Sequence, residues 1–392
     1  MKQVNLTTGI QMNLVMICER FPPDVGGLAT SGARIAATLS RLGYSVDVLV
    51  WSRHIPSGLL ETEQHEGARI HRLGRFSNWD LTLQHTLNVL DWLNEQKNYD
   101  IIWGHYLQPA GFLAVMYAKA NKLKSVVSAR GNDVDQMMFP PGDFARLKWT
   151  LDFATMVTSV SDELARKIRA TQGDDFQVKI IPNVVDLNIF SPGNPDQLLR
   201  EQLNIEEDEV ILGFSGELRH KKGLSFLPEA LARVRKERPA VLLIIGEIRA
   251  REQSAISAFA AENPSTATRI LTTGHIENTA EVARHLRICD IILQPSLWDG
   301  LPNAILEAMA CQNLVLASDA GGIPEVIQHD VNGVIIPKIK LHQLGYAILE
   351  TLSLPVERLD TIKLNARKSV EAQFCPKNEE KAIRSIVEQV LR

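Results

Sequence analysis

The sequence lacks a cysteine framework. Its four cysteines are far apart in a chain of 392 residues, and none belongs to a CxxC pair. This scatter favours buried, reduced thiols over a set of disulfides. The four are Cys18, Cys289, Cys311 and Cys375.

The sequence also lacks a long apolar run and an excess of basic charge. No run approaches the roughly 20 apolar residues of a membrane span. Charged Glu19 and Arg20 follow the first apolar run, Leu14 to Cys18, which argues against a secretory signal. The net charge of -4 argues against a nucleic-acid partner, which would require a basic stripe. Because 45% hydrophobic and 22% charged residues are ordinary for a globular protein, we expect a cytoplasmic location.

The first half of the chain alternates short β-branched runs with amphipathic stretches. This order is typical of a parallel, doubly wound sheet covered by helices. The expected strands are Leu14–Cys18, Val46–Val50, Ile101–Trp103, Ser125–Ser128 and Thr155–Ser159. The expected helices are Thr30–Leu42, Leu81–Asn94, Pro109–Asn121 and Asp162–Ala170.

The same alternation starts again after a segment rich in Pro, Gly and Asn. That segment, 181–195, is typical of a linker. We predict an α/β fold of two Rossmann-like, doubly wound parallel-sheet domains, 1–186 and 187–372, that face a central cleft. A C-terminal helix within 373–392 is expected to cross back to the first domain. The second set of strands is Val210–Phe214, Val241–Gly246, Arg269–Leu271, Ile291–Leu293 and Leu314–Ala317.

Residues 295–325 contain the most informative local pattern. Asp299 lies in a Gly-containing loop, Pro302 stands where a first helical turn begins, and Glu307 follows eight positions after Asp299. The positive end of that helix dipole and its free N–H groups can hold a phosphate. Two carboxylates beside an anion site suggest a neutral, hydroxyl-rich group joined to a phosphate, as in a nucleotide sugar.

Residues 216–223, GELRHKKG, follow the first strand of the second set and form a second phosphate-binding candidate. No Ser or Thr follows a Gly-Lys pair, so this is not a Walker A loop. Arg219 can bind a phosphate bidentately, and Lys222 supplies a compact charge. Cations at a helix start are unfavourable unless an anion binds there, which favours function over a solvated basic turn.

Two features of the first half lie at the ends of strands. Gly26 and Gly27, in PPDVGG (22–27), permit close approach of the backbone to a ligand, although a simple tight turn explains them as well. His105 follows the strand Ile101–Trp103, at the edge where parallel sheets bind ligands. A structural, hydrogen-bonded histidine is the alternative.

Taken together, these segments resemble the retaining GT-B glycosyltransferases of family 4. The resemblance covers nearly the whole chain and is densest in GELRHKKG (216–223), DGLPNAILEAMA (299–310) and ASDAGGIPEVI (317–327). PPDVGG, the His105 segment and IPNVVDLNIFSP (181–192) add to it. It implies an acceptor-binding first domain and a second domain that binds the nucleotide sugar.

The resemblance also implies roles for single residues. Lys222 and Arg219 would hold the donor diphosphate; the family's commonest Arg stands directly after the Gly, where this chain has Glu217. Glu307 would bind the ribose hydroxyls and Asp299, shorter than the family's Glu, the transferred sugar. The remaining donor-binding residues implied are Gly26, Gly27, Ile276, Gly300, Leu301, Pro302 and Asn303.

The acceptor side is less specified. Arg130 and Asp133 lie in a turn after Ser125–Ser128 that we expect to line the acceptor site. Asp133-Val134-Asp135 is formally a DxD metal motif, but metal binding is the weaker interpretation because no third carboxylate or His is nearby in sequence. The segment 140–149 suggests peripheral contact with a membrane or a lipid-linked sugar, and a solvated helix face explains it equally well.

The sequence-based hypothesis is metal-independent, retaining transfer of a hexose to a saccharide or lipid-linked hydroxyl. No cofactor other than the nucleotide-sugar donor is expected. UDP-glucose and bacterial surface polysaccharide synthesis follow from the resemblance alone. Asp299, His105, Lys222 and Arg219 are the catalytic candidates. The alternatives are an epimerase or phosphorylase on the same scaffold, and a silent sugar-nucleotide-binding protein.

Overall fold

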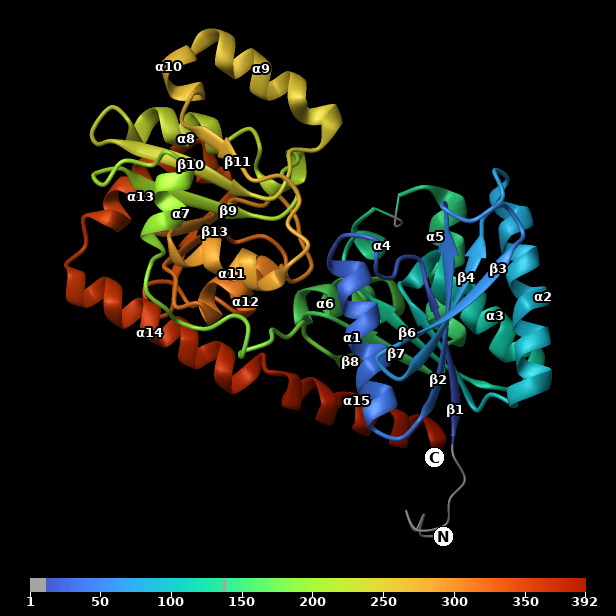
Figure 1. The fold of residues 1–392 in the computed structure, drawn as a ribbon. Coiled ribbons are helices and arrows are strands. Elements are labelled where there is room, and N and C mark those ends of the chain that lie inside the picture. The colour runs from blue at the N-terminus through green and yellow to red at the C-terminus, as the bar shows by residue number, and fades with distance from the viewer. Residues whose placement is uncertain (1–11, 137–138) are drawn as a thin grey trace. The chain divides into compact units, whose positions relative to one another are not determined.

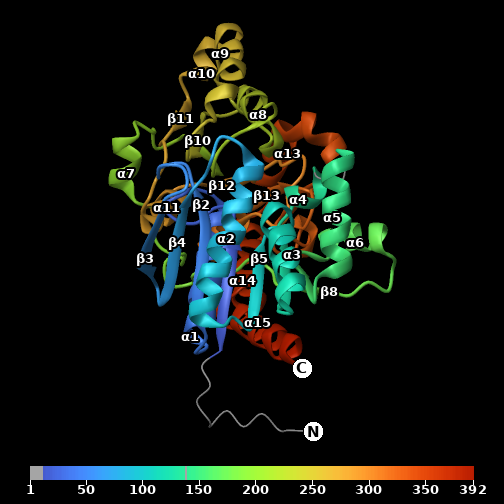
Figure 2. The same cartoon turned by 90° about the vertical axis from the view of Figure 1, so that its right-hand side faces the viewer.

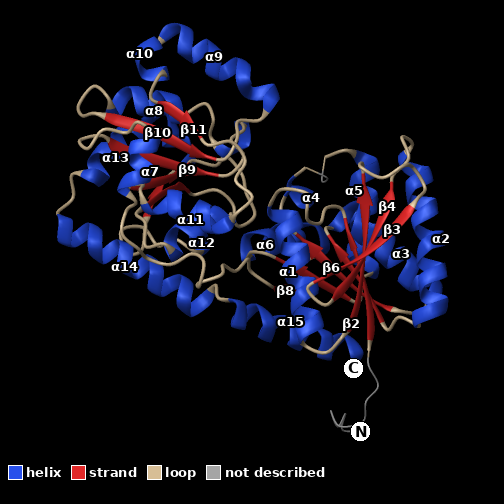
Figure 3. Ribbon diagram, in the orientation of Figure 1, coloured by secondary structure: helices blue, strands red, loops and turns tan. Residues whose placement is uncertain are grey.

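A computed structural model describes residues 12–136 and 139–392. Its internal contacts divide the chain into two compact units. The first contains the residues up to Pro182 together with Glu379–Arg392, and the second is Asn183–Asn378. The strands of each unit form a separate sheet with helices on its faces (Figure 3). Two α/β units with predominantly parallel sheets are therefore confirmed.

The sheet of the first unit has eight strands in the order β3-β4-β2-β1-β5-β6-β7-β8 (Figure 1). Every neighbouring pair is parallel except β3–β4. Because β2 and β5 lie on opposite sides of β1, the chain changes direction across the sheet at β1. The strands are β1 Asn13–Cys18, β2 Ser45–Ser52, β3 Leu60–His65, β4 Ala68–Gly74, β5 Ile101–His105, β6 Lys124–Ala129, β7 Met156–Ser159 and β8 Val178–Ile180.

Alternate side chains of β1 enter two different cores, as expected of a strand with both faces covered. Leu14 and Met16 pack with residues of α1 and α15. Val15 and Ile17 pack with residues of α2 and α3, which cover the other face (Figure 2). The helices of this unit are α1 Gly27–Arg41, α2 Trp79–Lys97, α3 Phe112–Asn121, α4 Asn132–Asp135, α5 Pro141–Phe153, α6 Asp162–Gln172 and α15 Pro376–Leu391.

The β3–β4 hairpin was not predicted. Its turn, Glu66-Gly67, has positive φ at both residues, which is the geometry of a tight hairpin turn. The strand β3 reads LETEQH and is largely exposed, so it shows no apolar run. Glu63 pairs with Arg72 across the hairpin at 2.6 Å, and the acidic edge protects the sheet from further pairing.

The sheet of the second unit is entirely parallel, in the order β11-β10-β9-β12-β13-β14. Its core is built from Leu, Ile and Val of both strands and helices. The strands are β9 Val210–Ser215, β10 Ala240–Ile245, β11 Ile270–Thr272, β12 Ile291–Gln294, β13 Val315–Ser318 and β14 Val334–Ile336. The helices are α7 Gln197–Gln202, α8 Leu227–Val234, α9 Gln253–Glu262, α10 Pro264–Ala267, α11 Thr279–Arg287, α12 Asn303–Ala310, α13 Leu344–Leu352 and α14 Val356–Gln373.

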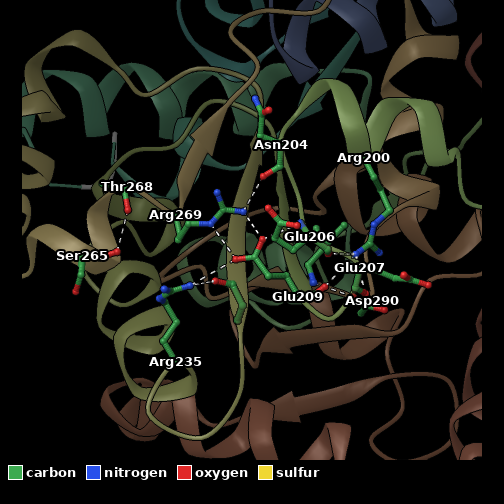
Figure 4. Close-up of polar contacts among 12 residues, drawn as sticks. Arg200, Asn204, Glu206, Glu207, Glu209, Arg235, Ser265, Thr268, Arg269 and Asp290 are labelled. Atoms are coloured by element: carbon green, nitrogen blue, oxygen red, sulfur yellow. Dashed lines mark hydrogen bonds and ion pairs between the residues drawn. The ribbon is translucent and has the colours of Figure 1, made fainter.

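A polar network joins the amino ends of these strands (Figure 4). Glu209, directly before β9, is almost fully buried and is paired with Arg269 and, at 3.6 Å, with Arg235. Asp290, directly before β12, accepts a hydrogen bond from the Ile211 N–H at 2.7 Å. The two acids thus have an ion-pair or hydrogen-bond partner, so neither is left buried without compensation.

Among the described residues, no helix is both long enough and apolar enough to cross a bilayer.

Candidate functional site

The second sheet places the two predicted phosphate-binding segments next to each other. Its central strand β9 is flanked by β10 on one side and by β12 on the other, so the chain switches direction there. Parallel sheets bind ligands outside the carboxyl ends of their strands at such a point. The loops that leave β9 and β12 at this edge are 216–223 and 295–302. The Leu297 N–H donates to the Lys221 carbonyl at 2.8 Å, which joins the loops.

Lys222 and Asp299, one from each loop, form an ion pair. Both side chains are largely buried, with 17% and 13% of their surface exposed. Burial by itself would raise the pKa of Asp299, but the charges of Lys222 and Lys221 hold it below its ordinary value. The switch point thus contains an ionised carboxylate in direct contact with a cation.

The loop after Asp299 leads into α12, which begins one residue later than the sequence predicted. Asp299 Oδ1 accepts from the Gly300 N–H at 3.0 Å, and Pro302 occupies the N-cap position of α12. Asn303 therefore opens a helix whose first N–H groups have no intrahelical partner. Glu307 is half-buried one turn further along the same helix. The buried Leu301 carbonyl accepts from Asn183 Nδ2 at 2.7 Å, which anchors the loop.

Arg219 lies in the β9 loop beside a second ion pair. Burial lowers the pKa of Arg219, and the neighbouring Glu217 carboxylate acts in the opposite direction. Arg219 Nη1 is 3.6 Å from Glu217 Oε2. Arg249, in the loop after β10, donates to the same carboxylate from Nε and Nη2, each at 2.7 Å. The position where the resembling family has an Arg is therefore occupied by a carboxylate with two Arg partners.

Ile276 lies at the same edge of the sheet, in the loop between β11 and α11, and is half-buried. Gly274 of this loop has a φ of +73° and open space around it. The space at the Cβ position of Gly274 is thus open, while the Gly274 carbonyl accepts from the Thr273 hydroxyl at 2.8 Å.

In the first unit, Gly26 and Gly27 stand at the start of α1, as expected. Gly26 is the N-cap residue with a φ of +123°, a value that favours glycine. Both glycines are exposed, and the Gly26 carbonyl accepts from the Thr30 N–H at 3.1 Å. An exposed helix N-terminus follows β1 at the switch point of the first sheet.

His105 is the last residue of β5 and is completely buried. Its Nε2 is 2.9 Å from Ser31 Oγ on α1, and Nδ1 has no partner among the described residues. Burial, with the charges of Arg130 and Arg34, holds the pKa of His105 well below its ordinary value, so the ring is neutral. These are properties of a structural histidine, and contact between His105 and a substrate stays a prediction.

The DxD segment serves the backbone instead of offering two carboxylates to a ligand. Asp133 is fully buried and accepts from the N–H groups of Leu107, Arg130 and Gly131 at 2.8–3.0 Å. Burial raises the pKa of Asp133 to about 6. Asp135 instead pairs with Lys167 at 2.5 Å. The structure thus gives no exposed Asp133 carboxylate to an acceptor, contrary to our expectation for this residue.

The neighbouring Arg130 is partly buried, and burial together with the charge of Arg34 lowers its pKa to about 9. Over residues 12–136 and 139–392, no group of three or more His, Cys, Asp or Glu side chains is arranged to hold a metal ion.

Comparison with known families identifies the chain. The family described as "Glycosyl transferases group 1" matches residues 195–369, and the family described as "Glycosyl transferase 4-like domain" matches residues 26–184. The chain is a group 1 glycosyltransferase of the family 4 type. The first matched range contains the whole second sheet with its switch point, and the second contains the first sheet from β2 to β8.

Individual relatives of this glycosyltransferase agree with the assignment. It is 25% identical over 320 residues to the N-acetyl-alpha-D-glucosaminyl L-malate synthase of Bacillus anthracis, covering 80% of this chain and 81% of that protein. It is 25% identical over 344 residues to the alpha-maltose-1-phosphate synthase of Mycolicibacterium smegmatis, covering 83% and 84%.

Solved structures show that the glycosyltransferase has the GT-B fold. Anabaena Alr3699/HepE, solved in complex with UDP-glucose, superimposes with a TM-score of 0.80 at 18% identity and covers 97% of this chain and 100% of that one. The sucrose-phosphate synthase of Thermosynechococcus elongatus superimposes with a TM-score of 0.80 at 19% identity, and the match covers 97% of this chain and 99% of that one.

Sequence reasoning missed the Glu217–Arg249 pair. A signal was present: β9 is followed by Gly-Glu-Leu-Arg (216–219) and β10 by Gly-Glu-Ile-Arg (246–249). The same four-residue pattern after two strands indicates that the two loops share a conformation. Only the order of the strands in the sheet shows that these strands are neighbours.

Proposed function

We propose that this glycosyltransferase transfers a hexose from a nucleoside diphosphate sugar to a hydroxyl group, with retention of the anomeric configuration. The observation that supports the proposal is the contact of Lys222 with Asp299 at the switch point of the second sheet. It places a cation suited to the diphosphate next to a carboxylate suited to sugar hydroxyls. UDP-glucose is the first donor to test, because the similarly folded Alr3699/HepE was solved with it.

In the proposed mechanism, the bond between the sugar C1 and the β-phosphate oxygen breaks, and its electron pair stays on the phosphate. Lys222, Arg219 and the first N–H groups of α12 stabilise the charge that develops there. The acceptor oxygen bonds to C1 from the same face, and its proton passes to the departing phosphate. Asp299 orients the sugar, and Glu307 binds the ribose hydroxyls.

The acceptor is proposed to be a saccharide or a lipid-linked saccharide, bound by the first unit. The segment 140–149 belongs to α5, where Trp149 packs against Phe112 with 5.4 Å between ring centroids. Its cations have acidic neighbours: Arg146 pairs with Asp143 at 3.6 Å, and Lys148 with Asp152 at 3.2 Å. Peripheral membrane contact through α5 stays a proposal that vesicle co-sedimentation tests.

The first experiment is a thermal-shift screen over nucleotide sugars, because a ligand that binds the native state stabilises it by mass action. We expect UDP and UDP-glucose to raise the melting temperature. Transfer is then measured with labelled donor in EDTA. Since protein cations balance the diphosphate charge in this proposal, we expect activity to persist. Loss of activity in EDTA with rescue by a divalent metal would refute the metal-independent mechanism.

A Lys222→Ala substitution tests the central contact. We expect turnover to fall by about a hundredfold or more, the effect typical of losing a transition-state charge donor. Lys236→Ala removes an exposed lysine of the same unit and serves as the control. A fully active Lys222→Ala enzyme contradicts the assignment. UDP release that does not depend on an acceptor, or UDP binding without turnover, favours the epimerase or the silent binding protein.

A further inference from the structure

Beyond the donor contacts, strands β9 and β10 remain paired past their ends. The Leu218 N–H donates to the Glu247 carbonyl at 2.8 Å, and the Arg249 N–H donates to the Leu218 carbonyl at 3.1 Å. Gly246, with a φ of +140°, allows this approach, because a Cβ there would lie 2.3 Å from the Gly216 carbonyl oxygen. The two Gly-Glu-aliphatic-Arg segments therefore lie side by side as one paired ribbon.

This ribbon brings Glu217 of the β9 loop to Arg249 of the β10 loop. Two parallel hydrogen bonds of 2.7 Å fix the carboxylate in the plane of the guanidinium. Only about a third of either side chain is exposed. A carboxylate held in this way has a defined position, which a solvated surface glutamate does not.

The fixed carboxylate in turn faces Arg219. Glu217 Oε2 lies 3.6 Å from Arg219 Nη1, and the charge of Arg249 would otherwise repel that of Arg219. Arg219 Nε has no hydrogen-bond partner among the described residues, and a quarter of the side chain is exposed. Arg219 therefore has Glu217 as an ion-pair partner on one side, and its buried Nε keeps bonding capacity for another acceptor.

We propose that Glu217 is a positioning residue, clamped by Arg249, that orients the guanidinium of Arg219 toward the donor diphosphate. This inference rests on the proposed function of Arg219. The resembling family has an Arg directly after the Gly. In this chain that position is Glu217, the cation Arg219 stands two residues later, and Arg249 is the second Arg that binds Glu217. Glu217 itself touches neither the sugar nor the phosphate.

A purely electrostatic role of Glu217 is the main competing interpretation, and it predicts the opposite change in UDP affinity on removal of the carboxylate. A carboxylate near an anion site repels the anion, so removal of its charge alone would tighten diphosphate binding. If Glu217 positions Arg219, removal of the charge weakens binding, because Arg219 loses its orientation. The Arg249→Lys substitution adds a second discrimination. It keeps the charge and removes the bidentate geometry, so a purely electrostatic role predicts no change.

The test is UDP binding by calorimetry and donor kinetics with the full-length chain. We expect Glu217→Gln to weaken UDP binding roughly tenfold, with KM for the donor rising more than kcat falls. We expect Arg249→Lys to weaken it several-fold. In an Arg219→Gln background, Glu217→Gln should have no further effect, because the residue it positions is gone. Glu229→Gln is the control, because it removes an exposed carboxylate on α8 of the same unit.

Unchanged or tighter UDP binding by Glu217→Gln overturns the inference, as do additive effects of Glu217→Gln and Arg219→Gln. If Glu217→Gln does not fold, unchanged UDP binding by Arg249→Lys overturns it equally. The proposed function fails separately, if the wild-type chain neither binds UDP nor transfers sugar. A different outcome refutes only the positioning role. In that outcome the wild type binds UDP and Arg219→Gln weakens the binding, but Glu217→Gln and Arg249→Lys leave it unchanged.

Discussion

Single residues at the carboxyl edge of the second sheet have partners that decide their chemistry. Lys222 contacts Asp299, so each side chain satisfies the charge of the other. Under the proposed function, a donor diphosphate would compete with Asp299 for Lys222. The ion pair limits the cost of burying either charge.

The substitution Asp299→Asn separates binding from transfer. Because Lys222 loses its competing carboxylate, we expect UDP to bind at least as tightly as to the wild type. We expect turnover to fall by about a hundredfold or more, because the ionised contact to the sugar is lost. Calorimetry and a transfer assay measure the two effects, with Asp360→Asn on exposed α14 as the control. Weaker UDP binding with normal turnover would assign Asp299 to the phosphate instead.

A buried residue of the first unit predicts a dependence of stability on pH. Asp47 has no exposed surface and accepts from His71 at 2.8 Å and from the Tyr99 hydroxyl at 3.0 Å. Burial would raise the pKa of Asp47, but His71, Tyr99 and Arg69 together lower it below the ordinary 3.8. A lowered pKa stabilises the fold above pH 3.8, and this contribution is lost as the pH falls through the folded pKa.

We therefore expect Asp47→Asn to destabilise the first unit by about 1–3 kcal/mol at neutral pH, because the buried His71 and the partly exposed Arg69 lose their charged partner. The difference in unfolding free energy between wild type and variant should shrink below about pH 4. Hydrogen exchange of the β2 and β4 amides at several pH values measures it. A difference that stays constant down to pH 2 would show that Asp47 does not titrate differently in the folded state.

Among the structural elements, the turn before the short helix Ile323–Glu325 packs against the loop 295–302, which contains Asp299. Gly321 has a φ of +54°, and a Cβ there would lie 1.7 Å from the Asp299 carbonyl oxygen. The neighbouring Gly322 N–H donates to the Gly300 carbonyl at 2.7 Å. The backbone of the β13 loop is thus packed directly against the backbone of the β12 loop.

A Gly321→Ala substitution must displace the Asp299 loop, because backbone atoms cannot yield to the added methyl group. We expect at least about a tenfold loss of turnover, since an ångström-scale displacement of a catalytic loop has effects of that size or larger. Gly173→Ala is the matched control: Gly173 also has a positive φ, of +109°, but nothing lies within 4 Å of its Cβ position. Equal activity of the two variants would show that the close approach is unimportant.

On the scale of the whole molecule, the C-terminal segment completes the first unit. Ile383, Ile386, Val387 and Val390 of α15 belong to the core that contains Leu14 and Met16 of β1. Glu379 is almost completely buried and bonds Arg34 Nε at 2.8 Å. The first unit is therefore built from both ends of the chain.

Truncation after Asn378 should consequently destabilise the first unit and leave the second folded. Four apolar side chains lose their burial, and the burial of each contributes about 1.5–3 kcal/mol to the free energy of unfolding. The summed loss is comparable to the whole stability of a typical domain. Hydrogen exchange resolved by peptide measures both units in the same sample. Loss of protection in β9–β14, or full protection of β1, would contradict this division of the chain.

Local sequence patterns were sufficient to predict the α/β class, the repeated alternation of strands and helices, and the loops that carry charge. The physical reason is that a strand buried on both faces must be apolar along its length. The loop at its end carries Gly and polar residues because its own turn geometry requires them. The start of α12, to within one residue at Pro302, also follows from the helix geometry of a few neighbouring residues.

Pairing over long distances in the chain was decided only by the tertiary structure. Lys222 meets Asp299 because β9 and β12 are neighbours, and Glu217 meets Arg249 because β9 and β10 are. The same holds for the complete burial of His105 and Asp133, and for the contact of Glu379 with Arg34, 345 residues apart. Strand order selects these partners through packing of the whole sheet, and no local pattern of residues contains that information.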